Sequence, residues 1–411
     1  MRWATVRIDD IKAETKHSLV GGPFGSDLVT RDYVEAGIPV IRGINLPDER
    51  LFSEDDFVFV REEKADSLLP NNAYPGDLIL TQRGTLGQVG LIPKNSRYQR
   101  FVISQSQMKL TVSDKKADAR FVYYFFRSPH TVQKIKNLAI SSGVPHINLG
   151  ILKDIEIPLP PMPSQQRIAE VLSSYDGLIE NNRRRIALLE ESARLLYKEW
   201  FVRLRFPGYE HTRIVDGVPE GWERKALPEI TSYINRGIAP HYDEDGEGTV
   251  INQKCIRNRT LDLSLARRQS KEYSPAKQVQ VGDVLINSTG EGTLGRVAQV
   301  KSPFANCTVD SHVTIVRPKP EIPLHGFGLA MTDREPHFSV MGRGATNQTE
   351  LSRAAIAEVS ILIPSHPIAQ AFEECADPIY KEITNLVAQN SKLKKARDLL
   401  LPRLMSGAIE V

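Results

Sequence analysis

Two stretches of this 411-residue chain follow one pattern of residues, and this repetition limits the folds that the chain can adopt. Gly76–Leu80 leads into Thr85–Gly87, and Gly282–Ile286 leads in the same way into Thr293–Gly295. Further positions recur without a gap 204 residues later (364 − 160): Pro160, Pro163, Gln166, Ile179 and Leu189 return as Pro364, Pro367, Gln370, Ile383 and Leu393. We therefore predict one module, a β-rich head followed by a long helix, that is present twice and has diverged.

Each head has the pattern of a β-rich domain. Brief runs of β-type residues bounded by Gly, Pro, Asn and Asp predict strands in the first head at Ile38–Ile41, Phe57–Val60, Asp77–Leu80, Met108–Val112 and Ile155–Ile157. Arg120–Leu138 is predicted to be helical, with a break at Pro129 because proline removes a helical hydrogen bond. The second head is expected to run from Trp222 to about Pro364.

An apolar stripe with 3-and-4 spacing follows each head and predicts a long helix. For the first helix, Ser164 is the expected N-cap, and the stripe comprises Ile168, Val171, Tyr175, Leu178, the polar Asn182, Leu189, Leu196 and Trp200, widened by Leu172, Ile179, Ile186 and Ala193. The second stripe comprises Phe372, Cys375, Ile379, Leu386, Leu393, Leu400 and Leu404. Pro378 is expected to kink or restart this helix, and Pro402 to end it.

The stripes are too long to be buried against one head each. From Ser164 to Arg203 the first helix would extend about 60 Å at 1.5 Å per residue. An antiparallel coiled coil of the two helices would bury both stripes; docking of each helix on a partner protein is the open alternative. The predicted fold class is α+β, with β-rich domains at residues 1–162 and 222–364, long helices at 163–205 and 365–411 (the latter with a C-terminal tail), and a connector at 206–221.

Composition adds few constraints. The net charge of +3 and pI near 8.6 neither require nor exclude nucleic acid, so a basic surface would have to be local. Cys255, Cys307 and Cys375 are far apart and form no CxxC pair, which fits a reducing compartment. The sequence contains no apolar run of signal-peptide type and none of about 18 residues. We therefore expect a cytoplasmic protein without a membrane span.

Several catalytic and cofactor patterns can be weighed and set aside. Gly290–Gly295 matches the dinucleotide fingerprint, but the following residues alternate like a strand, whereas that motif needs a helix. Pro160–Met162 lacks the acid and the aromatic residue of a methyltransferase loop, and no P-loop or histidine spacing for metal is present. Glu62–Lys64 is better read as a solvated charge run than as a nuclease motif. We expect no catalytic, cofactor-binding or metal-binding residues.

Basic residues suggest where a nucleic acid could bind. Arg183–Arg185 invites such an interpretation, although a solvated helix face is favoured. Arg83 and Arg296 flank the two equivalent glycine turns, and loops on a rigid sheet are common recognition sites. Ordinary surface charge is the alternative for this pair. Two similar but non-identical heads on one chain suggest a reader of two different half-sites.

Over nearly its whole length, the chain resembles the specificity (S) subunit of type I restriction–modification systems. The strongest local match is the C-terminus from Leu393 through Arg397–Ile409. Ile157–Pro161, followed by Gln165–Ala169 and Asp176, resembles the start of that family's central helix, and the Thr-Leu-Gly turns are also similar. In the second half Pro364-Ser365 replaces the double proline, and Tyr380 stands where the first half has Asp176. This difference argues against equal strength of the two contacts that the family makes with methyltransferase (M) subunits.

This resemblance implies a non-catalytic DNA-recognition subunit. Each head would read one half of a split, asymmetric site in double-stranded DNA, and the helices would set the gap and bind two methyltransferase (M) subunits. Restriction (R) subunits would join the complex, and S-adenosylmethionine and ATP would be bound by these partners. The polar residues chosen as candidate readers are Arg83, Gln105, Ser106, His146 and Asn148 in the first head, and Arg296, His312, Arg343, Asn347 and Gln348 in the second.

Two other functions are to be distinguished from this one. A fused restriction–methylation enzyme would need the methyltransferase loop and P-loop that are not seen. A coiled-coil scaffold without DNA contact would not need two diverged heads. A titration with DNA at several salt concentrations would distinguish it, because the scaffold would show no salt-dependent binding.

Overall fold

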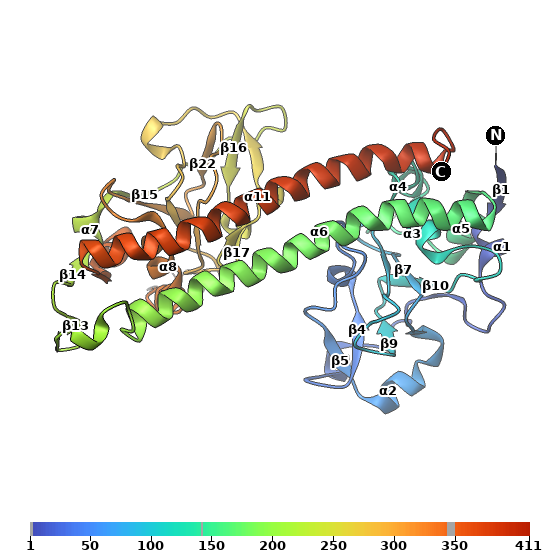
Figure 1. Ribbon diagram of the computed structural model, residues 1–411. Coiled ribbons are helices and arrows are strands. Elements are labelled where there is room, and N and C mark those ends of the chain that lie inside the picture. Colours follow the sequence, from blue (N-terminus) through green and yellow to red (C-terminus); the bar gives the residue numbers. More distant parts are fainter. Residues whose placement is uncertain (1–2, 141–142, 343–349) are drawn as a thin grey trace. The chain divides into compact units, whose positions relative to one another are not determined.

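The structure is a computed structural model that describes residues 3–140, 143–342 and 350–411. The chain divides into two compact units, residues 1–183 with 389–411 and residues 184–388 (Figure 1). Each unit therefore contains one head together with part of both long helices, α6 (Met162–Tyr197) and α11 (His366–Met405). Helix α6 continues into a π-helical turn, Lys198–Val202.

The first unit is built on a four-stranded antiparallel sheet and a five-stranded sheet. The order in the first is β2 (Leu19–Gly21), β10 (Gln107–Leu110), β7 (Leu78–Thr81) and β8 (Val89–Leu91). The second has the order β3 (Tyr33–Val34), β5 (Val58–Val60), β4 (Ile38–Ile41), β9 (Phe101–Ile103) and β6 (Asn72–Ala73). A further pair joins β1 (Ala4–Arg7) to β11 (Glu156–Leu159).

Helices complete this unit and supply most of its core. They are α1 (Ile8–Ile11), α2 (Glu62–Ser67), α3 (Ala119–Arg127), α4 (Pro129–Asn137) and α5 (Leu149–Asp154). Helix α3 begins where the Asp118 carboxylate accepts hydrogen bonds from the backbone N–H groups of Arg120 and Phe121, which satisfies two otherwise unpaired donors. Its buried run Phe121–Phe126 packs with α6 and with the end of α11 in one apolar cluster.

The second unit repeats the first sheet arrangement. Its four-stranded sheet has the order β15 (Thr231–Arg236), β23 (Val313–Pro318), β20 (Val284–Asn287) and β21 (Val297–Gln299), so corresponding strands take the same places as β2, β10, β7 and β8. The other strands are β12 (Ile214–Val215), β13 (Val218–Pro219), β14 (Glu223–Ala226), β16 (Gly248–Ile251), β17 (Ile256–Arg257), β18 (Thr260–Leu261), β19 (Arg267–Gln269), β22 (Cys307–Val309) and β24 (Ser360–Ile363). The helices are α7 (Leu227–Ile230), α8 (Leu324–Asp333), α9 (Glu335–Val340) and α10 (Arg353–Glu358).

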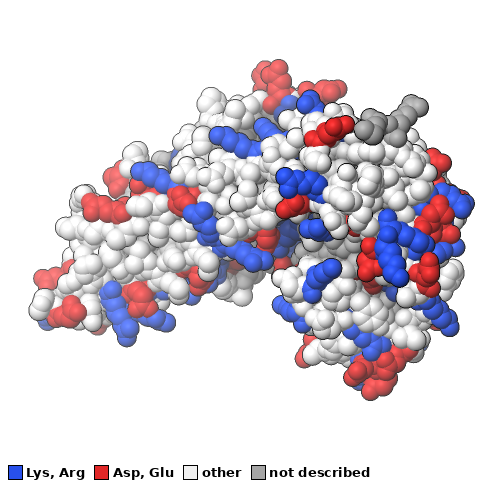
Figure 2. Space-filling model, turned by 45° about the vertical axis from the view of Figure 1, so that its right-hand side comes forward, with Lys and Arg blue, Asp and Glu red and all other residues white. Residues whose placement is uncertain are grey.

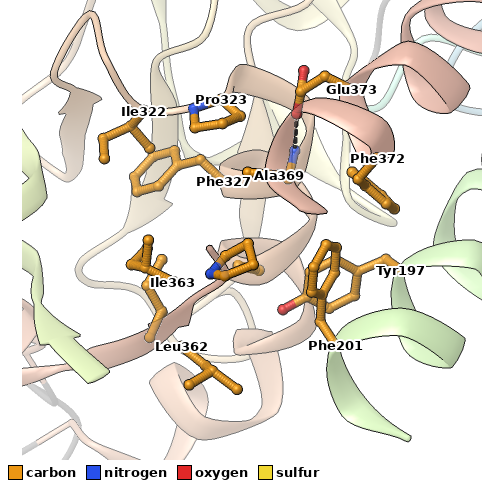
Figure 3. A pocket seen from close by; sticks show the side chains of 14 residues that line it. Tyr197, Phe201, Ile322, Pro323, Phe327, Leu362, Ile363, Ala369, Phe372 and Glu373 are labelled. Atoms are coloured by element: carbon orange, nitrogen blue, oxygen red, sulfur yellow. Dashed lines mark hydrogen bonds between the residues drawn. The ribbon is translucent and has the colours of Figure 1, made fainter. Parts of the chain in front are cut away.

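Aromatic side chains pack between the two long helices of the second unit. Phe372 of α11 lies 4.8 Å from Phe201, between ring centroids, and Tyr197 packs against both (Figure 3). An apolar cavity of about 40 Å³ remains between these rings and the side chains of Pro323 and Phe327. Binding pockets for small molecules are about 300–1,000 Å³, so this cavity is a packing gap rather than a ligand site.

The strand predictions agree with the structure, with ends that differ by at most two residues. The break at Pro129 is confirmed, because Ser128 caps α4 and Pro129 is its first residue. The strand expected after Gly290–Gly295 is confirmed as β21. The connector predicted at residues 206–221 contains the β12–β13 hairpin.

Some details of the helix predictions are wrong. Helix α6 begins at Met162, so Ser164 lies inside its first turn and is not the N-cap. Helix α11 runs through Pro378 and Pro402 to Met405, and thus neither restarts at the first proline nor ends at the second. Leu178 and Cys375, assigned to the apolar stripes, are exposed.

Within each unit the two long helices contact each other in an antiparallel sense. In the first, the amide of Asn182 donates to Asn390 Oδ1 at 3.0 Å, and Arg397 binds Asp176 at 2.5 Å. In the second, Arg185 binds Glu382 at 2.6 Å. Residue numbers thus rise along one helix as they fall along the other.

Candidate nucleic-acid interface

Most of the candidate DNA-reading residues of the first head lie at one edge of its four-stranded sheet, β2-β10-β7-β8. Strands β2 and β7 are antiparallel to β10, and Gly21 and Thr81 pair with Met108 and Gln107 at the beginning of β10. The C-terminal ends of β2 and β7 therefore lie beside the N-terminal end of β10. The residues that follow or precede these strand ends share this edge.

Backbone hydrogen bonds fix Arg83, Ser106 and His146 at this edge. The Ser106 carbonyl accepts hydrogen bonds from the N–H groups of Gln82 (2.7 Å) and Arg83 (3.3 Å). Arg83 forms an antiparallel β-bridge with His146, and the N–H of Ile147 donates to the Gln82 carbonyl at 3.0 Å. Because Arg83 is exposed and His146 is half-buried, both can present polar atoms to a ligand.

Two of the chosen residues have side chains in structural hydrogen bonds. The amide of Gln105 donates to the carbonyls of Gly25 (2.5 Å) and Leu28 (3.0 Å). Asn148 caps α5, because its Oδ1 accepts a hydrogen bond from the Ile151 N–H at 2.9 Å. Gln105 thus shapes a neighbouring loop, and Asn148 positions a helix.

The loop held by Gln105 carries Phe24, a residue that was missed. Its side chain is 86% exposed, which is unusual for an aromatic residue. A side chain on Gly22 would collide with the Ser104 carbonyl, so the loop lies close against the start of β10. The only signal in the sequence is Gly21-Gly22-Pro23-Phe24-Gly25, an aromatic residue within a turn-forming segment.

The second head has the same backbone frame. Asn287, the last residue of β20, pairs with Val313 at the beginning of β23, and the Ser288 N–H donates to the His312 carbonyl at 2.8 Å. Thr289 forms a β-bridge with Glu350, as Arg83 does with His146 in the first head. His312 therefore occupies the place of Ser106, directly before the strand.

Side chains at this second edge also bind one another. The His312 ring nitrogen Nδ1 lies 2.8 Å from Thr289 Oγ1, and the His312 N–H donates to Asp310 Oδ1 at 2.9 Å. Burial raises the pKa of the Asp310 carboxyl. Arg236, which was not chosen from the sequence, ends β15 and binds Glu350 at 2.7 Å.

Arg296 lies beside the same edge, because its carbonyl accepts a hydrogen bond from the Asn287 N–H. Its guanidinium donates to the Gly292 carbonyl at 2.9 Å, so it stabilises the glycine turn. The three remaining candidates, Arg343, Asn347 and Gln348, lie outside the described residues.

The arginine cluster on α6 forms intramolecular ion pairs. Arg183 binds Glu49 at 2.7 Å and Arg185 binds Glu382 at 2.6 Å. Arg183 and Arg185 thus have acidic partners within the chain, so the cluster is not simply the solvated helix face that was favoured from the sequence. Figure 2 shows basic and acidic side chains interspersed over the visible face, so any attraction for an anion there is local.

Neither a metal nor a membrane site is indicated by the described part of the chain. Within residues 3–140, 143–342 and 350–411, no group of three or more His, Cys, Asp and Glu side chains could hold a metal ion. In the same residues, no helix is long and apolar enough to span a bilayer.

Comparison with known proteins gives a consistent result. Residues 63–191 match the family model described as the type I restriction modification DNA specificity domain. The chain is 27% identical to the type I restriction enzyme MjaIX specificity subunit of Methanocaldococcus jannaschii, over 85% of this chain and 81% of that protein. It is 23% identical to the EcoBI specificity subunit of Escherichia coli, over 79% of this chain and 72% of that protein.

A solved structure has a similar fold. The type I restriction–modification S subunit of M. genitalium superposes with a TM-score of 0.54 at 18% identity, and covers 98% of this chain and 96% of that one. The family model, the relatives and this fold agree with the resemblance inferred from the motifs. Residues 63–191 thus match a type I restriction modification DNA specificity domain, and most of the chain is similar to type I restriction enzyme specificity subunits.

Proposed function

We propose that this chain is the DNA sequence-recognition subunit of a type I restriction–modification complex, in which each head reads one half of a bipartite, asymmetric site. One observation carries the proposal: the two heads share a backbone frame at one sheet edge but present different side chains there. Arg83, Ser106 and His146 in the first correspond to Thr289, His312 and Glu350 in the second. Two heads that recognise different DNA sequences need the same backbone arrangement but different polar side chains.

The chemistry of these groups suits base recognition. An arginine can donate two hydrogen bonds to guanine, and serine, threonine and histidine can donate to or accept from base edges in the major groove. Phosphate contacts from other lysine and arginine side chains would position each head without reading sequence. Arg83 is the strongest candidate for a base contact in the first head, because it is exposed on a β-bridged segment.

The helices are proposed to act as a spacer and as a docking surface. Pairing of α6 and α11 as an antiparallel coiled coil would fix the gap between half-sites, and the sheet order common to both heads supports an origin by duplication. Apolar side chains that remain exposed on the helices support docking of two M subunits: Leu178, Leu188 and Leu195 on α6, and Val387 and Leu399 on α11.

Catalysis is proposed to belong to the partners. The M subunits would bind S-adenosylmethionine and methylate DNA, and R subunits using ATP would join the same complex in the cytoplasm. The purified chain is expected to bind DNA in a salt-dependent manner and to methylate none, whereas addition of its M subunit and S-adenosylmethionine should produce methylation. Methylation by the chain alone, free of M, would refute the non-catalytic role.

Substitution of Arg83 tests the reading edge. In the complex with M subunits, Arg83→Ala should relax the base preference in one half of the methylated site, with a loss of about 1–3 kcal/mol for the preferred base. The measurement is the sequence distribution of methylated sites. Arg7→Ala, an exposed arginine on β1 away from this edge, is the control and should leave the site unchanged. Changes in both halves, or in neither, would contradict the assignment.

A further inference from the structure

The contacts between the long helices differ in chemistry between the two units. In the first, the guanidinium of Arg397, a residue only 3% exposed, binds Asp176 at 2.5 Å, and the Tyr124 hydroxyl donates to the same carboxylate at 2.7 Å. The repeat offset of 204 residues relates Asp176 to Tyr380 and Arg397 to Ala193. Tyr380 and Ala193 are buried in one apolar cluster. A buried ion pair thus corresponds to an apolar pair.

A second position shows the same change. Asn182 donates a hydrogen bond to Asn390 in the first unit, at 3.0 Å. The same offset relates these residues to Leu386 and Ile186. Leu386 is buried and Ile186 is half-buried. An amide pair in one unit therefore corresponds to two aliphatic residues in the other.

At a third position the charges are reversed. Glu49, from the first head, binds Lys394 of α11 at 3.0 Å. The residue related to Lys394 is Glu190 of α6, which binds Lys301 of the second head at 2.7 Å. The head supplies the acid in the first unit and the base in the second.

These three positions decide which helices can pair. If two copies of the first half of the chain paired with each other, Asp176 would face Ala193, Asn182 would face Ile186, and Glu49 would face Glu190. A buried charge or amide without its partner is strongly unfavourable, and like charges in contact repel. Two copies of the second half would likewise place Leu386 against Asn390 and Lys301 against Lys394.

We propose that the positions of Asp176–Arg397, Asn182–Asn390 and Glu49–Lys394 are a pairing-specificity surface, which accepts the helix of the other half of the chain and rejects a second copy of the same half. This surface acts in assembly and does not depend on DNA recognition. It favours pairing between the two different halves over pairing of like halves from two copies of the chain, because an assembly of two first halves would leave these groups unpaired.

The experiment uses the full chain, cut after purification. A protease site is placed at Asp216-Gly217, the exposed turn of the β12–β13 hairpin, to give an N half and a C half that remain associated. Isotopically light and heavy preparations are mixed and warmed until mixed-isotope complexes show that halves exchange. Native mass spectrometry then counts N–C and N–N pairs.

The original chain should exchange into N–C pairs with few N–N pairs. The triple variant Asp176→Tyr/Asn182→Leu/Glu49→Lys gives the N half the pairs that the second unit already uses, Tyr with Ala193, Leu with Ile186 and Lys with Glu190. Its N–N fraction should rise by about tenfold or more, because Asp176→Tyr and Asn182→Leu each convert a buried mismatch into a match. Glu49→Lys gains Glu190 as a partner in the N–N pair, and its contact with Arg183 of its own half is the same in both kinds of pair. Statistical N–N pairing in the original chain, or exclusive N–C pairing in the variant, would overturn the proposal.

Two further variants separate pairing from stability. Glu49→Lys alone changes a half-exposed residue without altering the core, and should raise the N–N fraction to an intermediate value. Leu178→Tyr/Asn181→Leu/Glu62→Lys introduces the same residue types at exposed positions and should leave the N–N fraction at its original value. A rise in this control equal to that of the triple variant would refute the assignment of specificity to the three positions.

Discussion

Replacing Arg397 with methionine is expected to lower the free energy of unfolding of the first unit by about 3–5 kcal/mol. The guanidinium is buried and binds Asp176 at 2.5 Å and Asp398 at 2.8 Å. Its removal leaves the Asp176 carboxylate in the apolar junction without its buried cation, and the Tyr124 hydroxyl still donates to it. Hydrogen exchange of β7 and β10 across a urea series measures the loss in this unit.

Two companion variants identify the cause. Asp176→Leu/Arg397→Met should recover most of the lost stability, because replacing both buried charges with apolar groups is often nearly neutral. Lys394→Met removes the exposed partner of Glu49 from the same helix and should cost less than about 1 kcal/mol. If Arg397→Met costs no more than Lys394→Met, the buried pair does not stabilise the unit as argued.

Five strands of the first head were predictable from the sequence. Strands alternate with glycines that need a positive φ, such as Gly84 (φ 97°) and Gly87 (φ 93°), and few other residues adopt that backbone conformation. Such turns fix where strands end, and therefore which residues lie at the sheet edge. This is why Arg83, which precedes Gly84, could be expected from the sequence to lie in a loop next to a strand.

Side-chain hydrogen bonds within the edge were not predictable. Gln105 and Arg296 were chosen as polar loop residues, but their side chains bind backbone carbonyls of adjacent loops and turns. Which carbonyl lies within reach depends on the loop conformation. For the same reason the exposure of Phe24 could not be foreseen, because an aromatic residue is ordinarily assigned to the core.

Long-range helix contacts were also beyond the sequence patterns. Apolar residues that repeat on average every 3.5 residues drift around a helix that has 3.6 residues per turn. A long apolar stripe therefore does not specify which of its residues are buried. Leu172 and Ile179 are buried, whereas Leu178 is exposed. The partner of Asp176 lies 221 residues away, and only the pairing register of the two helices places Arg397 opposite it.

Lengthening both helices by one heptad should widen the gap between half-sites by about three base pairs, if the helices set that gap. An insert after Leu189 alone would leave α6 longer than α11, so the matched design adds a second heptad after Ile383, whose side chain joins Leu189 in one apolar cluster. Seven residues preserve the 3-and-4 spacing. The seven inserted residues lengthen each helix by about 10 Å at 1.5 Å per residue. This length corresponds to about three base-pair steps of 3.4 Å on DNA.

The bases read should not change, because the sheet edges of both heads are untouched. The methylated sites of a complex containing the double insert are therefore expected to keep the parental half-sites with a longer non-specific gap, although rotation of the heads about the duplex should lower activity. The single insert after Leu189 is the control and should lose more activity, since its helices no longer match in length. Methylated sites that keep the parental gap in the double insert would show that another part of the complex sets the spacing.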